Sequence, residues 1–356
     1  MTDDSVLAAN GGRWPQPALR SLLRSLPAAV AAAPFWFASS LTRSISEAVR
    51  LGPTVTPWPE LLRYVPEIGW HSRPDLDAFA LADHVFHITT DAEGWRGHQS
   101  IEGADVLVFG DSYAFGHGVN DDDIYAHHTD GVVVKPLGSD GYSMVHAVLW
   151  MERLQPRITD KVVVWMVYPG NDLHDNLRPN YGRYRMPFIR QREGQWELYT
   201  EHVSEEPWPC DDGSANYPKE LAKLCTPGSE TDRALAGAAY LVEKAAGVCR
   251  EAGAALVVLS VPRREQIDED RIEDLRAQAP QPERFDPSLL DAGLLEACAA
   301  AGVPFVALSE VLVADDYQVA DIHWTPAGNA KVGRWLAQRY RDEWRGLTGS
   351  ASVPTS

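Results

Sequence analysis

The sequence contains few cysteines and lacks a surplus of basic residues. Its 356 residues include four cysteines, whose spacings match no zinc-binding pattern. Lys and Arg total 32 against 50 Asp and Glu, so the formal net charge is -18. Nucleic acid and anionic membrane surfaces both favour a basic face. The composition therefore argues against a zinc module and against nucleic acid as a partner.

The sequence also lacks an apolar run that we interpret as long enough to span a membrane. The run Leu26–Leu41 follows three arginines and has the basic-then-apolar order of a signal peptide. Pro27 and Pro34 interrupt it, and a spanning helix needs roughly 20 apolar residues. We interpret the run as part of a helical arm that packs on the domain. This favours a cytoplasmic protein without a stable membrane span, and export through residues 26–41 is the alternative.

The four cysteines fall into two pairs by context. Cys249 and Cys298 lie in alanine-rich helical segments and are expected to be buried apolar side chains. Cys210 and Cys225 flank a polar loop that contains Pro and Gly. They would form a disulfide in an exported protein, and free thiols are the favoured interpretation.

The first 100 residues differ in sequence pattern from the rest of the chain. We predict a helical N-terminal arm followed by a small lead-in, together covering residues 1–100. In the lead-in, HVFHITT at 84–90 alternates like a strand, and residues 91–94 form a turn. The lead-in is expected to pack beside the main sheet.

Residues 101–348 are predicted to form the main domain, followed by a disordered tail at 349–356. Apolar strands alternate with helices, which predicts an α/β class fold: a three-layer α/β/α sandwich with a mainly parallel five-stranded sheet. The predicted strands lie within residues 106–110, 132–138, 161–172, 255–262 and 303–309, and the predicted helices within 142–154, 232–252, 287–301 and 326–344.

One long segment, residues 173–230, breaks this alternation. It is rich in Arg, Tyr, Pro and Trp, and Glu193-Gly194 is expected to turn a hairpin within it. Long insertions in compact domains are usually functional or disordered. We predict that the segment is a lid or a substrate wall.

Chemically useful residues recur where predicted strands end. Ser112, in Gly110-Asp111-Ser112, follows the first strand of the main domain, and helix capping alone would also explain it. Gly138-Ser139-Asp140-Gly141 follows the second strand and taken alone suggests a plain turn. Asn171 follows the third, where it is either a neutral oxyanion donor or part of an Asx turn. Ligands of open α/β sheets bind at this edge.

A histidine near the C-terminus suits a general base. Asp321 precedes His323 by two residues, so in a turn its carboxylate is able to fold back onto the ring. The ordinary histidine pKa near 6.5 suits proton transfer at neutral pH. A histidine that only caps the next helix is the alternative.

Together these residues resemble the SGNH, or GDSL-type, hydrolases over about residues 105–344. That family is named for a serine in GDS, a glycine after the second strand, an asparagine in GND and a C-terminal histidine, which match Ser112, Gly141, Asn171 and His323 here. The resemblance implies the family's flavodoxin-like sandwich and an ester-cleaving or acyl-transferring site. It is closest to bacterial esterase- and acetyltransferase-like members.

The resemblance also implies roles. Ser112 would attack the acyl carbon, His323 would take its proton, and Asp321 would orient His323. The Ser112 and Gly141 N–H groups and the Asn171 side chain would form the oxyanion hole.

Two departures from the family pattern affect these roles. Many members place the aspartate three residues before the histidine, a position held here by Ala320, whereas Asp321 fits a DxHW variant. Pro136 stands where an asparagine is usual, which makes Gly138 a rival to the preferred Gly141.

Other residues are candidate substrate contacts: Tyr113, Arg263, Gln266 and Trp324. Asp111 is expected to tie loops together without acting in catalysis. The histidines outside the site show no metal spacing and are interpreted as surface or polar-pocket residues: His117, His127, His128, His146 and His174.

The leading hypothesis is a serine esterase that forms an acyl-enzyme on Ser112 and acts on a small-molecule or carbohydrate-like ester, without a metal or an organic cofactor. An O-acyltransferase with the same serine is the first alternative. A catalytically silent binding module is the second. Acyl length, the alcohol portion and the oligomeric state do not follow from the sequence.

Overall fold

The computed structural model describes residues 55–209, 217–319 and 321–349. The predictions for the N-terminal arm with its run Leu26–Leu41, for a disulfide at Cys210 and for the C-terminal tail therefore lie outside the described residues. Within these ranges, no helix has the length and apolar character needed to cross a bilayer.

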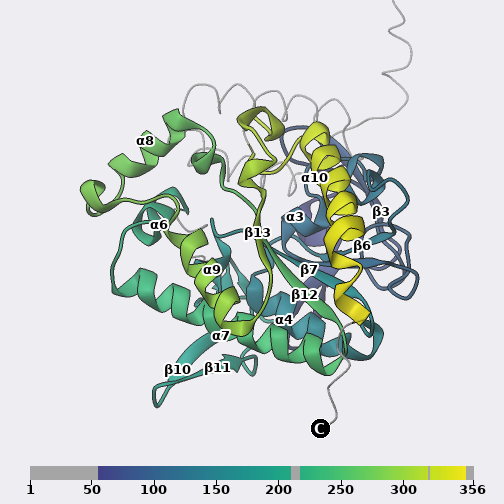
Figure 1. The fold of residues 1–356 in the computed structure, drawn as a ribbon, viewed down its shortest axis with the longest axis horizontal. Helices are drawn as coiled ribbons and strands as arrows, with labels where there is room; N and C mark the ends of the chain where they lie inside the picture. The colour runs from purple at the N-terminus through teal and green to yellow at the C-terminus, as the bar shows by residue number, and fades with distance from the viewer. Residues whose placement is uncertain (1–54, 210–216, 320, 350–356) are drawn as a thin grey trace, which may run out of the picture.

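The centre of the fold is a parallel sheet of five strands, in the order β13-β12-β7-β5-β6 (Figure 1). All residues of β5, β6 and β7 are buried, as expected for strands covered on both faces. The mainly parallel five-stranded sheet predicted from the sequence is confirmed. The strands are β5 Val106–Gly110, β6 Val134–Gly138, β7 Val162–Val167, β12 Ala255–Ser260 and β13 Phe305–Ala307.

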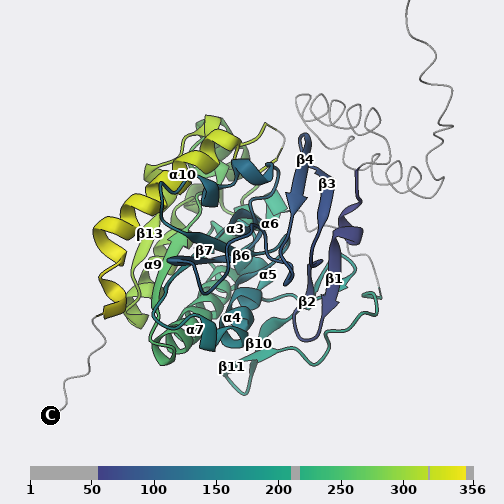
Figure 2. The same cartoon turned by 90° about the vertical axis from the view of Figure 1, so that its right-hand side faces the viewer.

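Alternate residues of each central strand face two separate hydrophobic cores. In β5, Leu107 and Phe109 pack with α4, α7 and α9, whereas Val106 and Val108 pack with α3 and α10. Figure 2 shows α10 on one side of the sheet and α4 and α7 on the other. The predicted three layers are thus confirmed. The helices are α3 Ser112–Phe115, α4 Met144–Arg153, α7 Ser229–Glu251, α9 Leu289–Ala301 and α10 Pro326–Arg339.

The four predicted helices are present with small shifts at their ends. The last one continues from α10 into a π-helical turn, Tyr340–Trp344. Among the described residues, two helices of eight or more residues were not predicted, α6 Tyr217–Leu224 and α8 Glu269–Ala277. Leu275 is the buried residue of α8, so that helix lacks the repeating apolar face on which a sequence prediction depends.

The lead-in consists of two antiparallel hairpins that stand beside the β6 edge of the sheet (Figure 2). One pairs β1 Leu62–Val65 with β2 Gly69–Ser72, and the other pairs β3 Asp77–Leu81 with β4 Val85–Thr89. The predicted strand at 84–90 is confirmed by β4. The turn at 91–94 is confirmed too, because Asp91 Oδ1 accepts the backbone N–H groups of residues 93–95 at 2.9–3.0 Å.

The segment 173–230 has two parts with different positions. The predicted hairpin is confirmed: β10 Phe188–Arg192 pairs with β11 Gln195–Tyr199 through Glu193 and Gly194, both at positive φ. It packs on α7, where Gly237 allows the close approach of Ile189 and Trp196.

The first part of that segment lies elsewhere, at the loop after β6. It follows the short helix α5 Asp172–Asp175, and its strand β8 Asn180–Tyr181 pairs with β9 Tyr184–Arg185. The Tyr181 ring lies next to Gly141, at 3.4 Å from the position of a Cβ built on that glycine. These residues therefore reach the carboxyl edge of the sheet near the candidate site.

Candidate active site

Ser112 is the first residue of α3, directly after the tight turn that ends β5. Gly110 is needed there, because a Cβ at that position would lie 2.7 Å from the Met166 carbonyl oxygen. Asp111 Oδ1 accepts the Tyr113 N–H at 2.9 Å and so caps the helix. The strand and the cap together fix the Ser112 hydroxyl at the carboxyl edge of the sheet.

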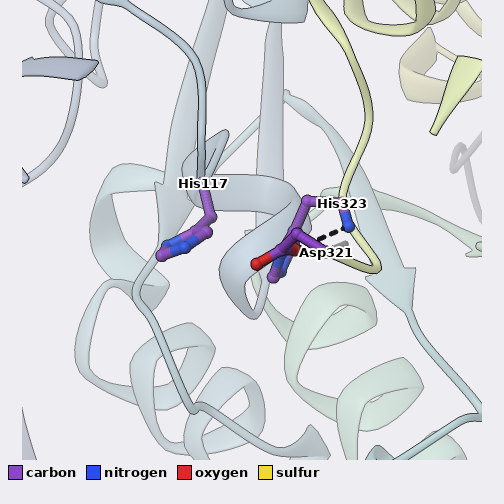
Figure 3. A group of neighbouring side chains, drawn as sticks. All are labelled: His117, Asp321 and His323. Atoms are coloured by element: carbon purple, nitrogen blue, oxygen red, sulfur yellow. Dashed lines mark hydrogen bonds and ion pairs between the residues drawn. The ribbon is translucent and has the colours of Figure 1, made fainter. Parts of the chain in front are cut away.

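Ser112, His323 and Asp321 form a continuous chain of hydrogen bonds. Ser112 Oγ lies 2.6 Å from His323 Nε2. The other ring nitrogen, Nδ1, is hydrogen-bonded to Asp321 Oδ1, which also accepts the His323 backbone N–H at 2.9 Å. Figure 3 shows the Asp321 carboxylate folded back against the His323 ring. This arrangement holds Nε2 ready to accept the serine proton.

The electrostatics of this chain favour an ionised Asp321. Burial alone would raise the pKa of the Asp321 carboxyl group, but the charge and hydrogen bonds of His323 hold that pKa well below its ordinary value. An anion on the Nδ1 side stabilises the imidazolium that forms when His323 takes a proton.

The loop that carries His323 is fastened to the segment after Ser112. Tyr113 donates its hydroxyl hydrogen bond to the Ile322 carbonyl oxygen. Gln318 Nε2 bonds the carbonyl oxygens of Gly118 and Trp324, each at 3.2 Å. These bonds fix the distance between the serine and the histidine, which come from opposite ends of the domain.

The candidate oxyanion residues lie at the ends of the strands on either side of β5. Gly141, with φ 74°, follows β6, and Asn171 follows β7. Among the described residues, none accepts a hydrogen bond from the Gly141 N–H, whereas Asn171 Nδ2 donates one of its two hydrogens to Asp175 at 3.2 Å. Gly138 differs, since a Cβ on it would lie 2.5 Å from the Asp111 carbonyl oxygen. Gly138 thus serves close packing of β6 on α3.

The four residues predicted as candidate substrate contacts pack on or bond to other residues of the protein. Tyr113 and Trp324 are buried, and their rings pack on each other. Arg263 is also buried and donates from Nη1 to Cys225 Sγ at 2.7 Å. The Gln266 amide bonds Asp291. The first two support the His323 loop, and the polar groups of the last two are directed at protein partners, so none of the four is placed as a free substrate contact.

The structure adds His117 to the candidate site. From the sequence, His117 was interpreted only as a surface or polar-pocket histidine. The His117 ring centroid lies 4.5 Å from that of His323, and its Nδ1 is 3.0 Å from Asp140 Oδ2. Burial would lower the pKa of His117, but Asp140, with Asp321, raises it to about 9. A pKa in this range favours the protonated, cationic form of His117 at neutral pH. Its place five residues after Ser112 is the signal in the sequence that could have found it.

His117, Asp321 and His323 are close enough for a metal ion to bridge, since their donor atoms lie within 4.8 Å of one another (Figure 3). Several of these atoms are already engaged, however: His117 Nδ1, Asp321 Oδ1 and both ring nitrogens of His323. His117 is bonded to Asp140, Asp321 to His323, and His323 to Ser112. A metal ion on His323 would have to replace its bond to Ser112 or to Asp321, so we assign the three residues to the hydrogen-bonded site.

The chain was compared with known families and proteins. Residues 224–354 match the family model of the SGNH hydrolase-like domain of the acetyltransferase AlgX. The matched segment contains Asp321 and His323, whereas Ser112, Gly141 and Asn171 precede it. A search of curated proteins gave no match.

Several solved structures of low sequence identity are similar to the chain. An inhibitor-bound aryl esterase of M. smegmatis is 14% identical, with 67% of this chain and 98% of that chain covered and a TM-score of 0.37. A carbohydrate acetylesterase from Sinorhizobium meliloti gives the same four values. A GDSL-like lipase from Bacteroides thetaiotaomicron is 13% identical, with coverages of 66% and 87% and a TM-score of 0.35. The family match confirms the resemblance to SGNH hydrolases.

Proposed function

We propose, from the SGNH hydrolase-like character of the chain, that the protein is a serine esterase that forms an acyl-enzyme on Ser112. The observation that carries this proposal is the chain of hydrogen bonds from Ser112 through His323 to Asp321. A serine that merely caps a helix has no need of a histidine 2.6 Å from its hydroxyl, or of a carboxylate behind that histidine.

The proposed reaction has two steps. Ser112 Oγ attacks the acyl carbon as its proton passes to His323 Nε2. The C–O bond to the alcohol then breaks, and His323 returns that proton to the leaving oxygen. Water next attacks the acyl-enzyme, with His323 first accepting a proton from water and then giving it to Ser112 Oγ. The negative charge of each tetrahedral intermediate would be held by the Ser112 and Gly141 N–H groups and by the Asn171 amide.

The aromatic residues beside Gly141 support an ester of an alcohol with apolar faces, such as a carbohydrate. Trp58 packs edge-on against Tyr184, with ring centroids 5.2 Å apart, and the Tyr181 ring lies 6.4 Å from that of Trp58 and next to Gly141. All three rings are partly buried. Ligand sites are commonly lined by aromatic faces with a few placed polar groups. In this proposal, the part of the insertion at residues 180–184 forms a substrate wall.

An O-acyltransferase is a second candidate because the family model matched by residues 224–354 is that of an acetyltransferase. It would share the first step with the esterase. An acceptor hydroxyl would replace water in the second step, and His323 would deprotonate it. The two functions differ only in the molecule that resolves the acyl-enzyme.

The test compares the native protein with Ser112→Ala, His323→Ala and the control Ser100→Ala, which alters an exposed serine. We expect the native protein and the control to hydrolyse aryl acetates and both site variants to lose nearly all turnover. Equal rates for the native protein and Ser112→Ala on acetyl and longer acyl esters would refute hydrolysis.

Two further measurements separate the alternatives. Labelling by a fluorophosphonate that disappears in Ser112→Ala would contradict a silent binding module. Turnover that requires an added sugar acceptor, together with acylated sugar as product, would favour the transferase over the esterase.

A further inference from the structure

The motif Gly69-Trp70-His71-Ser72 forms β2, a strand of the lead-in that lies outside the main sheet. All four of its residues are buried. Its contacts converge on the loop Ser139–Tyr142, which carries Gly141. Trp70 Nε1 donates to the Asp140 carbonyl oxygen at 2.8 Å, and Tyr142 donates its hydroxyl to the Trp70 carbonyl oxygen at 3.0 Å.

Two more bonds join the same strand to the same loop. His71 Nδ1 lies 3.0 Å from the Tyr142 hydroxyl, and Ser72 Oγ lies 3.3 Å from Ser139 Oγ. Every residue of the loop except Gly141 is therefore hydrogen-bonded to β2, and these bonds lie in a buried environment. A strand whose sole task was to cover the sheet would not need this set of polar contacts to one turn.

The loop itself is a β-turn in which one peptide plane decides where the Gly141 N–H points. Tyr142 N–H donates to the Ser139 carbonyl oxygen at 3.3 Å, which closes the turn. Gly141 has φ 74°, whereas Asp140 is not among the residues with positive φ. This is the type II pattern, with glycine at the third position.

Type I and type II turns differ by a flip of the central peptide, here the one between Asp140 and Gly141. In a trans peptide, the carbonyl and the N–H point in opposite directions. The indole of Trp70 holds the Asp140 carbonyl oxygen, so the Gly141 N–H points away from Trp70. Loss of the indole bond would remove the contact that keeps this peptide in its type II orientation.

A second contact fixes the Asp140 side chain. His117, two residues after the end of α3, holds Asp140 Oδ2 at 3.0 Å. The residue before Gly141 is thus held by its main chain from β2 and by its side chain from the segment that follows α3. This geometry links the candidate nucleophile and the candidate oxyanion loop.

We propose that β2 is a clamp that sets the orientation of the Gly141 N–H, with Trp70 as its principal positioning residue; this inference rests on the proposed function of Gly141 as an oxyanion donor. The lead-in is then part of the catalytic apparatus, although none of its residues takes part in the chemistry.

The test uses Trp70→Phe in the full chain, which keeps an aromatic ring but removes the indole N–H. The control is Trp150→Phe, since Trp150 Nε1 donates a bond of 3.0 Å to the side-chain hydroxyl of Tyr142, whereas Trp70 Nε1 bonds the main chain of Asp140. We expect Trp70→Phe to lower kcat on an aryl acetate roughly tenfold with KM unchanged, because loss of a complete oxyanion donor typically costs ~10²–10³ in rate. The control should retain wild-type kcat.

Two readouts separate positioning from misfolding. Active serine is titrated with a fluorophosphonate, so that kcat refers to folded protein only. An arylboronic acid, which forms a tetrahedral adduct on serine, should bind Trp70→Phe about tenfold more weakly. Equal kcat and equal boronic acid affinity for Trp70→Phe and the wild type would overturn the clamp.

Hydrogen exchange tests the clamp independently of activity. Amides in the peptide covering residues 139–142 should exchange faster in Trp70→Phe and in Ser72→Ala than in the wild type, and unchanged exchange in both would overturn the proposal. A wild type that turns over no ester would contradict the proposed function, whereas the exchange result would still decide the clamp.

Discussion

The ion pair between His117 and Asp140 predicts how the stability of the protein depends on pH. The pKa of His117 is raised from 6.5 to about 9 in the folded state, because the charge and hydrogen bond of Asp140, with Asp321, outweigh burial and the repulsion of Arg96. The adjacent His323 ring lies 4.5 Å away, centroid to centroid. At about 1.4 kcal/mol per pH unit, this rise corresponds to roughly 3 kcal/mol.

The sign follows from the direction of the change. A histidine that binds its proton more tightly in the folded state stabilises the fold fully below the unfolded pKa of 6.5. That contribution falls as the pH rises and is gone above about 9. His117→Gln, which is neutral throughout, should therefore be less stable than the wild type by roughly 2–3 kcal/mol more at about pH 6 than at about pH 9.5.

The assay is urea unfolding followed by tryptophan fluorescence at about pH 6, 7.5 and 9.5. The control is His98→Gln, which alters an exposed histidine and should give the same difference from the wild type at every pH. A stability difference between the wild type and His117→Gln that does not change with pH would show that His117 is not held as a cation, and the ion-pair reasoning would be wrong.

Three further predictions concern the site. Asp321→Asn should lower kcat at least ~10²-fold with little change in KM, because the amide does not stabilise the imidazolium form of His323; steady-state rates on an aryl acetate test this, and unchanged kcat would contradict it. Gly141→Ala should lower both kcat and stability, the latter by about 1–2 kcal/mol, because a Cβ is strained at φ 74° and would lie 3.4 Å from the Trp70 ring; urea unfolding at native stability would contradict it. Burial raises the pKa of Asp111 to about 6, so wild-type stability should fall by up to roughly 3 kcal/mol between about pH 4 and pH 7, and Asp111→Asn should remove that fall while keeping the helix cap; equal pH dependence of unfolding would refute it.

The central sheet was predictable because its strands are short apolar runs that end in turn residues. Val106–Gly110 coincides with the predicted strand, and the others lie within the predicted ranges. Because these strands are buried on both faces, they can be recognised as apolar runs without knowing which helices cover them. The charged helix Glu269–Ala277 was not predictable in this way, since it buries little and carries no apolar stripe.

The candidate site was predictable where a chemically distinctive residue stands at the end of a strand or in a C-terminal loop, because few residue types suit each role. Ser112, Asp321 and His323 were named from the sequence, and the structure places them in hydrogen-bond contact. His117 and Trp70 were not, because each acts through the backbone or side chain of Asp140, and that contact depends on how separate segments pack. A single histidine or tryptophan gives no pattern from which such a partner follows.

The fastening of the His323 loop has a consequence for how the chain folds. Tyr113 and Ile322 are joined across 209 positions, and Ser112 and His323 across 211. Contacts of such separation close long loops, whose entropy cost must be met before the contact stabilises the chain, so we expect them to form late in folding. The turn that carries Ser112 is complete within a local stretch of the chain, whereas His323 lies just before α10 and is placed together with that helix. The proposed esterase activity would therefore report the final docking of the C-terminal helix: we expect a refolding chain that has regained its secondary structure to stay inactive until α10 is packed on the sheet.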